Sequence, residues 1–126
     1  MIEDYLEQIR VRLVTSIIVD EFHIVEEWNQ LDEGYIRIRL KLSNGDFLEV
    51  AEYFALSDDG LSPIRYRYQW MDADQKHLRR RWDNVEHYPH LTNYPDHIHL
   101  SDGSVVPGER LGIVALLDLL EKALLG

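Results

Sequence analysis

The chain has 126 residues, of which 45% are hydrophobic and 29% charged, and we expect a single folded domain over residues 1–126 with a sizeable core. It has no cysteine, which excludes disulfides, thiolate metal sites and a cysteine nucleophile. The formal net charge of −10 argues against a protein that coats nucleic acid.

The first predicted element is a helix over residues 2–14, where apolar side chains recur at helical spacing. Residues 16–28 follow and are rich in β-branched and aromatic side chains, which predicts a strand. Residues 35–42 alternate strictly between apolar and polar side chains. This alternation is typical of a half-buried strand, here with a basic outer face.

Residues 43–45 have the sequence Ser-Asn-Gly and predict a hairpin turn. A three-residue loop with Gly45 in the left-handed region would place Leu40 opposite Leu48. A two-residue turn would instead bring Glu49 beside Leu40 on the apolar face. We predict the three-residue loop, because a slip of one residue exchanges the two faces of a strand.

A further hairpin is predicted from residues 63–71 and 76–82. Residues 84–107 look irregular, with a short edge strand at residues 97–100, and residues 109–125 predict a closing helix. We therefore expect an α+β fold, with a single antiparallel twisted sheet of five or six strands and an N-terminal and a C-terminal helix packed on one face.

The charge is unevenly distributed along the chain. Residues 61–82, here called the basic segment, carry six basic and two acidic side chains, whereas both flanking regions are acidic. Five of these six bases are arginines, whose planar guanidinium suits phosphate or carboxylate. No apolar run approaches the roughly 20 residues that span a bilayer, and the acidic first residues lack the pattern of an export signal. A cytoplasmic location is expected.

The chemically suggestive residues lie at positions 66–99. They form three groups of the sequence: Tyr66-Arg67-Tyr68-Gln69-Trp70-Met71-Asp72, then Arg81-Trp82-Asp83-Asn84, then His87 with Pro95-Asp96-His97-Ile98-His99. This combination resembles the TumE toxin family, small prokaryotic proteins encoded beside a helix-turn-helix antitoxin. In the family pattern a second histidine often follows directly after the first, where this chain has Tyr88 after His87. Two histidines also often follow the proline, where this chain has Asp96 before His97.

The resemblance implies a toxin that inhibits growth through RNA or the ribosome, with a helix-turn-helix antitoxin as partner, and it implies no particular catalytic residue. From the residues themselves, metal-independent RNA cleavage needs a base, an acid and cations that stabilise the phosphorane-like charge. Our candidates are His87 and His97 for proton transfer and Arg79 and Arg81 for the phosphate. Arg67 and the three aromatic residues at period two would bind the substrate, these three being Tyr66, Tyr68 and Trp70.

Four further residues between positions 66 and 99 are candidates for the site, namely Asp72, Asp83, Asn84 and His99. Each group also has a structural interpretation. The aromatic residues at period two are typical of a packed sheet face, the arginines can form a solvated edge, and Asp and Asn are common turn formers.

Two other functions stay open. The chain could be a non-catalytic binding or regulatory protein that uses its acidic surface. It could also bind a metal through its four clustered histidines, which are His87, His90, His97 and His99, although their spacing matches no standard zinc motif. The favoured interpretation needs neither a metal nor another cofactor, and no membrane. A homodimer could form through the strand at residues 97–100 or through Leu119 and Leu125.

Overall fold

The computed structural model describes residues 1–126. Its elements are, in chain order, α1 (Ile2–Thr15), β1 (Val19–Gln30), β2 (Glu33–Leu42), β3 (Phe47–Ser57), β4 (Gly60–Met71), β5 (Leu78–Asp83), β6 (His97–Leu100), β7 (Val105–Pro107) and α2 (Ile113–Leu125). The predicted α+β class and its two terminal helices are confirmed. Neither helix is long and apolar enough to cross a membrane.

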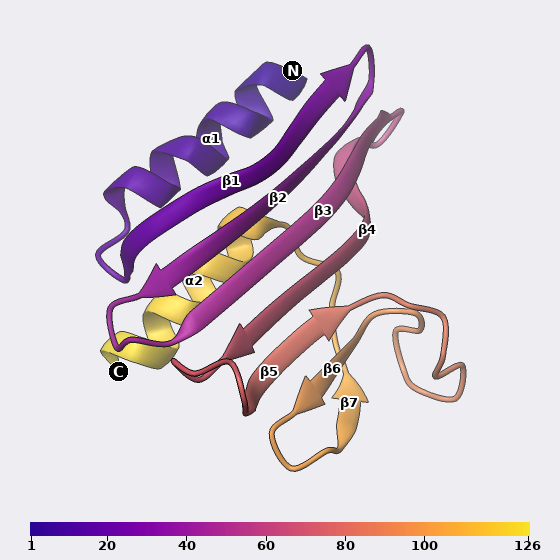
Figure 1. The fold of residues 1–126 in the computed structure, drawn as a ribbon. Coiled ribbons are helices and arrows are strands. Elements are labelled where there is room, and N and C mark those ends of the chain that lie inside the picture. Colours follow the sequence, from indigo (N-terminus) through magenta and orange to yellow (C-terminus); the bar gives the residue numbers. More distant parts are fainter.

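The seven strands form one antiparallel meander in which each strand pairs with the next one along the chain (Figure 1). The sheet therefore has seven strands rather than the five or six expected. The extra strand is β7, whose three residues are too few to show a period in the sequence. Because β7 pairs outside β6, residues 97–100 are not at the edge of the sheet as predicted. They have a neighbour on each side.

The C-terminal helix begins at Ile113, four residues later than predicted. Gly108 is packed so closely on β6 that an added Cβ would lie 3.0 Å from the Ile98 side chain and 3.2 Å from the backbone of His97. Gly112 has an extended backbone and immediately precedes the helix. The segment between the two glycines is thus held against the sheet before the chain turns into α2.

Both helices pack on one face of the sheet, and α2 runs behind β2 and β3 in Figure 1. Nineteen buried side chains form a single core that joins the apolar stripes of the helices to the inward face of the strands. The helices contribute Ile2, Leu6, Ile9, Leu13, Ile113, Leu116, Leu117 and Leu120. The alternation predicted for residues 35–42 is confirmed, since every second residue from Ile36 to Leu42 is buried.

The register predicted for the first hairpin is also confirmed. Leu40 lies opposite Leu48, and Arg39 lies opposite Glu49. Gly45 has a φ of 90°, in the left-handed region that the three-residue loop requires. The buried aliphatic side chains of β2 and β3 therefore face the helices together.

One carboxyl group lies within this core. Glu52 on β3 is fully buried and accepts hydrogen bonds from the hydroxyls of Tyr5 and Tyr68 and from the backbone N–H of Ile113. Burial raises the pKa of Glu52, and the three donors oppose that rise. These contacts connect α1, β3, β4 and the first turn of α2.

The other face of the sheet carries no helix, and we call it the uncovered face. Residues directly opposite one another in neighbouring strands place their side chains on the same face, so this face is built of cross-strand rows. One row contains Trp28, Tyr35, Tyr53 and Arg65; a second contains Arg37, Ala51, Arg67, Asp83 and His97; a third contains Arg39, Glu49, Gln69, Arg81 and His99. The most chemically suggestive side chains of the sheet therefore share one side.

Candidate functional site

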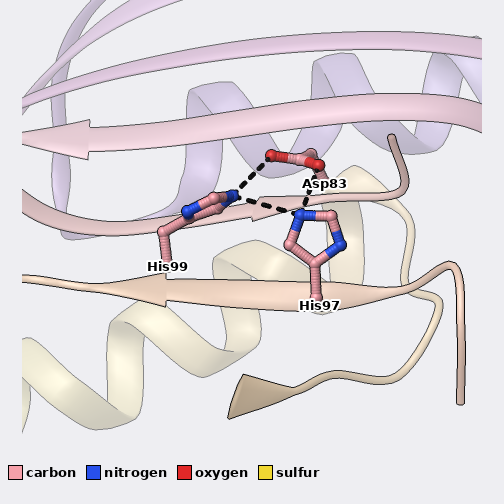
Figure 2. Close-up of side chains that lie close together, drawn as sticks. All are labelled: Asp83, His97 and His99. Atoms are coloured by element: carbon pink, nitrogen blue, oxygen red, sulfur yellow. Dashed lines mark hydrogen bonds and ion pairs between the residues drawn. The ribbon is translucent and has the colours of Figure 1, made fainter. Parts of the chain in front are cut away.

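A cluster of four side chains lies where β5 and β6 pair on the uncovered face. Arg81 and Asp83 come from β5, and their direct partners His99 and His97 come from β6. Nε2 of His97 lies 2.8 Å from Oδ1 of Asp83 and 3.1 Å from Nε2 of His99 (Figure 2). Nε of Arg81 lies 3.0 Å from Oδ2 of Asp83. We call these four residues the histidine cluster.

The acceptors around His97 determine where its protons lie. Nδ1 of His97 is 2.8 Å from the carbonyl oxygen of Pro95, which can only accept, so Nδ1 carries a proton. The other ring nitrogen faces the Asp83 carboxyl group at 2.8 Å, and two lone pairs do not share such a contact. One proton therefore lies between Asp83 and His97. With Arg81 protonated and His99 neutral, the histidine cluster carries a net charge of +1.

Arg81 determines the tautomer of His99. Nη2 of Arg81 lies 3.0 Å from Nε2 of His99, and a guanidinium only donates, so this nitrogen of His99 is an acceptor. Burial and the positive charge of Arg81 both lower the pKa of His99. The proton of the neutral ring consequently lies on Nδ1, which has no partner in the protein and points away from the cluster (Figure 2).

Exposure separates the two histidines. The side chain of His97 is only 2% exposed, whereas that of His99 is 16% exposed. Only one buried side-chain polar atom in the protein lacks a hydrogen-bond partner, the hydroxyl of Ser16, so the unpartnered Nδ1 of His99 is accessible to solvent. His99, weighed only as a secondary candidate from the sequence, is thus the imidazole that can contact a bound molecule.

Tyr88 is the residue of this site that sequence reasoning missed. Its ring centroid lies 4.9 Å from that of His97 and 5.9 Å from that of His99, in edge-to-face geometry. The rings of His87 and His90 each lie 6.4 Å from it. The sequence did contain a signal for Tyr88, because this residue stands where the family pattern often has a histidine. Only the fold, however, places its ring among those of His87, His90, His97 and His99.

The predicted aromatic substrate-binding residues lie elsewhere. Tyr66 and Tyr68 are 4% and 0% exposed and belong to the core, with their hydroxyls on Asp96 and Glu52 respectively. Trp70 is half-buried on the same face. The structure thus supports the packed-sheet interpretation of these rings, because Tyr66, Tyr68 and Trp70 face the helices. The two buried tyrosine rings do not present a surface to a base.

Arg79 does not join Arg81. A bulge in the pairing of β4 with β5 leaves Arg79 without a direct partner in β4. Its Nε lies 3.2 Å from Oδ2 of Asp46, which also accepts from the indole of Trp70 at 2.9 Å. The expectation that Arg79 and Arg81 share one face is therefore not met, because the bulge interrupts the alternation.

The remaining candidates have separate surroundings. Arg67 lies on the uncovered face, where it contacts no carboxylate and donates to the side-chain oxygen of Gln69. Asn84 accepts from the backbone N–H of Tyr66 and donates to the carbonyl of Ile64, which is a structural role. Asp72 closes the turn before β5, where hydrogen bonds from the His77 ring and from the backbone N–H groups of Lys76 and His77 lower its pKa to about 2.

A metal ion could be held by Asp83, His97 and His99, whose ligand atoms lie within 4.8 Å of one another. The bond from Nδ1 of His97 to a carbonyl is the outer contact that metal-binding histidines usually make. However, Nη2 of Arg81 donates to the lone pair of His99 that such an ion would need. A metal would have to displace both this guanidinium and the proton shared by Asp83 and His97. His87 and His90, expected to join such a site, do not belong to this group.

A depression of about 770 Å³ lies away from the histidine cluster. It is lined by Trp82 and Ile98 on the helix-facing side of the sheet and by α2 residues such as Leu119, and it contains none of the four clustered side chains. This depression therefore does not coincide with the candidate functional site.

These features define an α+β protein with a compact cationic cluster of histidine, arginine and aspartate on one open sheet face. The chain belongs to the TumE toxin family, since the family model for toxin TumE matches residues 6–124. The family predicted from the residues at positions 66–99 is thereby confirmed. It makes the protein the toxin component of a toxin–antitoxin system, and it implies an antitoxin partner. Neither the curated proteins nor the solved structures yielded a match.

Proposed function

We propose that this toxin is a metal-independent endoribonuclease whose active site is the histidine cluster. The observation that carries the proposal is the chain of contacts from Asp83 through His97 to His99, which ends on a solvent-facing ring nitrogen. Arg81 lies beside this chain. The cluster thus offers a proton, a route for it and a cation within one small area.

The reaction is transphosphorylation. The 2′-oxygen of a ribose attacks the adjacent phosphorus, a bond to the 5′-oxygen of the next nucleotide breaks, and the products are a 2′,3′-cyclic phosphate and a 5′-hydroxyl. A base must accept the proton of the 2′-hydroxyl, and an acid must donate one to the departing 5′-oxygen. No oxidant, water or metal is consumed.

His99 is the proposed acid. Its Nδ1 gives its proton to the 5′-oxygen while its Nε2 receives the proton held between His97 and Asp83. His97 touches no substrate in this scheme, since it is buried, and it is a positioning and relay residue. The sequence hypothesis is thereby modified, with the acid role moving from His97 to its accessible neighbour.

Arg81 is the proposed phosphate ligand. When it turns from His99 to the phosphate, its charge stabilises the negative charge that develops on the phosphoryl oxygens. His87, exposed on the loop between β5 and β6, remains the candidate for the base, and Tyr88 lies between it and the cluster. Since the substrate is cellular RNA, the proposal places the protein in the cytoplasm, free or at the ribosome.

The antitoxin is proposed to be a helix-turn-helix protein that covers this face. A homodimer through Leu119 and Leu125, which are 47% and 58% exposed, stays a proposal as well. The alternative dimer through an edge strand at residues 97–100 is removed by β7.

The test is a His99→Ala variant, assayed for RNA cleavage in vitro and for growth inhibition in cells. We expect both to fall by about 10²- to 10⁴-fold, the usual contribution of a general acid or base. His77→Ala, which removes an exposed histidine in the turn before β5, is the matched control and retains activity. Unaltered cleavage by His99→Ala would overturn the proposal. Growth inhibition without RNA cleavage in the wild type would favour the non-catalytic binding protein.

A further inference from the structure

The row of side chains next to the histidine cluster contains three aromatic rings. Trp28, Tyr35 and Tyr53 lie side by side on β1, β2 and β3, since Trp28 pairs with Tyr35 and Tyr35 pairs with Tyr53. The ring centroids of Trp28 and Tyr35 are 6.4 Å apart with an interplanar angle of 23°, and Trp28 lies 6.4 Å from Tyr53. No helix covers these rings.

The rings are accessible and belong to a hollow of the surface. Trp28 is 39% exposed, and Tyr35 and Tyr53 are half-buried. A depression of about 420 Å³ is lined by both tyrosines together with Ala51, Arg65, Arg67 and Asn84. Ala51 is the small residue of the neighbouring row, so the depression extends from the rings across β3 and β4 toward the end of β5.

Unpaired cations flank this depression. Arg65 lies directly opposite Tyr53, and Arg67 lies directly opposite both Ala51 and Asp83. Neither arginine forms an ion pair with a carboxylate of the protein. Asp83, directly opposite Arg67, is already bonded to Arg81 and His97, and Glu49 is bonded to Arg37 and Arg39. Glu86 also lines the depression but pairs with neither Arg65 nor Arg67. The protein is acidic overall, but this strip of it offers free guanidinium groups.

We infer that Trp28, Tyr35 and Tyr53 form a stacking platform for bases of single-stranded RNA, which Arg65 and Arg67 hold by its phosphates on the way to the histidine cluster. The inference rests on the proposed function and adds its substrate class. Strands are about 4.8 Å apart, so Tyr53 on β3 lies about 10 Å across the sheet from Asp83 on β5, which neighbouring nucleotides can span. Stacking on aromatic rings needs bases that are splayed out, which excludes a duplex.

This platform replaces the one expected from Tyr66, Tyr68 and Trp70. Tyr66 and Tyr68 of that set are buried, whereas all three rings on the uncovered face are at least partly exposed. A flat row of rings beside free arginines fits nucleic acid better than a protein partner, since this row contains no aliphatic side chain. We therefore infer that RNA binds this row, and the experiment distinguishes it from the antitoxin.

The experiment measures binding of a short fluorescent 2′-O-methyl oligouridine to the full chain by anisotropy. This probe lacks the attacking 2′-hydroxyl and cannot be cleaved, so binding is measured independently of catalysis. We expect Tyr53→Leu and Trp28→Leu to weaken binding by about 5- to 150-fold each, the usual effect of losing one stacked base. Tyr53→Phe keeps the ring, loses the hydroxyl bond to Glu33, and retains binding.

Phe22→Leu is the matched control. Phe22 is also an aromatic side chain of β1 with 38% exposure, but it lies opposite Leu40 on the helix-facing side, and its loss leaves RNA binding unchanged. A duplex of the same length should compete poorly. Unchanged affinity in Tyr53→Leu, or antitoxin binding as the only property that it loses, would overturn the inference. Tight stacking-dependent binding by a chain that cleaves no RNA would instead refute the proposed function alone.

Discussion

Arg81 and His99 face each other across β5 and β6, with Nη2 of the arginine 3.0 Å from Nε2 of the histidine. A guanidinium in this position holds the imidazole neutral and places its proton on the opposite nitrogen. The same contact blocks the nitrogen that a metal ion would need. One pair of residues thus favours proton chemistry over metal binding at this site.

Replacing Arg81 should raise the pKa of His99. Burial and the charge of Arg81 lower that pKa below the ordinary 6.5, while Asp83 opposes them. In Arg81→Gln the charge is gone, so the titration of His99 should move to higher pH. The measurement is an NMR titration of the histidine ring protons, with the four histidines outside the histidine cluster as internal references. An unmoved His99 titration would mean that burial alone sets this pKa.

Zinc should inhibit the toxin rather than activate it. A divalent ion bound by Asp83, His97 and His99 would take the place of the proton that the proposed reaction uses. RNA cleavage by wild-type toxin should therefore persist after treatment with a chelator and fall on addition of zinc. Arg81→Gln should bind zinc more tightly, as measured by calorimetry. Cleavage that a chelator abolishes and zinc restores would contradict this.

Salt should weaken RNA binding in proportion to the phosphates contacted. Each phosphate neutralised on a single strand contributes about −0.7 to the slope of log affinity against log salt concentration. Arg65→Gln and Arg67→Gln should each reduce the slope by about that amount. Lys122→Gln, which removes a cation from α2, should not change it. Equal slopes in all three variants would remove Arg65 and Arg67 from the phosphate path.

Glu52 should make the protein less stable as the pH rises. Burial raises the pKa of Glu52 in the folded state above its ordinary value of 4.5, so the folded protein binds this proton more tightly than the unfolded chain does. Its contribution is fully present below about pH 4.5 and is lost as the pH rises through the raised value. The difference in unfolding free energy between wild type and Glu52→Gln, measured with urea at several pH values, should follow this course.

Gly45 should tolerate asparagine but not valine. Its φ of 90° lies in the left-handed region, and an added Cβ would meet no atom within 4 Å, so the cost of a substitution is one of backbone conformation. Gly45→Val should lower the unfolding free energy by about 1–2 kcal/mol, and Gly45→Asn by clearly less. Thermal unfolding measures both. Equal losses would show that side-chain crowding decides instead.

The fold was predictable to a large extent because its signals are local. The helical stripe around Leu6, the alternation around Ile38 and the turn glycine at Gly45 each specify their own element. β7 and the late start of α2 were not predictable, because three residues show no period and Gly108 acts through a contact with β6.

The site was less predictable because it depends on which strands pair. The alternation of side chains along β4 does not tell which face of the strand is buried. The sequence could therefore not distinguish the buried Tyr68 from an exposed ring. The bulge that removes Arg79 and the pairing that joins Asp83 to His97 involve residues on separate strands. The platform on Trp28, Tyr35 and Tyr53 joins three strands and has no signature in any one of them.

The consecutive pairing of all seven strands also has a kinetic meaning. Contacts between sequence neighbours close short loops and allow a sheet to grow hairpin by hairpin, while the chain is still being translated. The aromatic row is complete when β3 has emerged, whereas His97 and His99 come much later and α2 seals the core last. Under the proposed function, a nascent chain that still lacks His97 and His99 could not cleave RNA, so toxicity would begin only when translation is nearly finished.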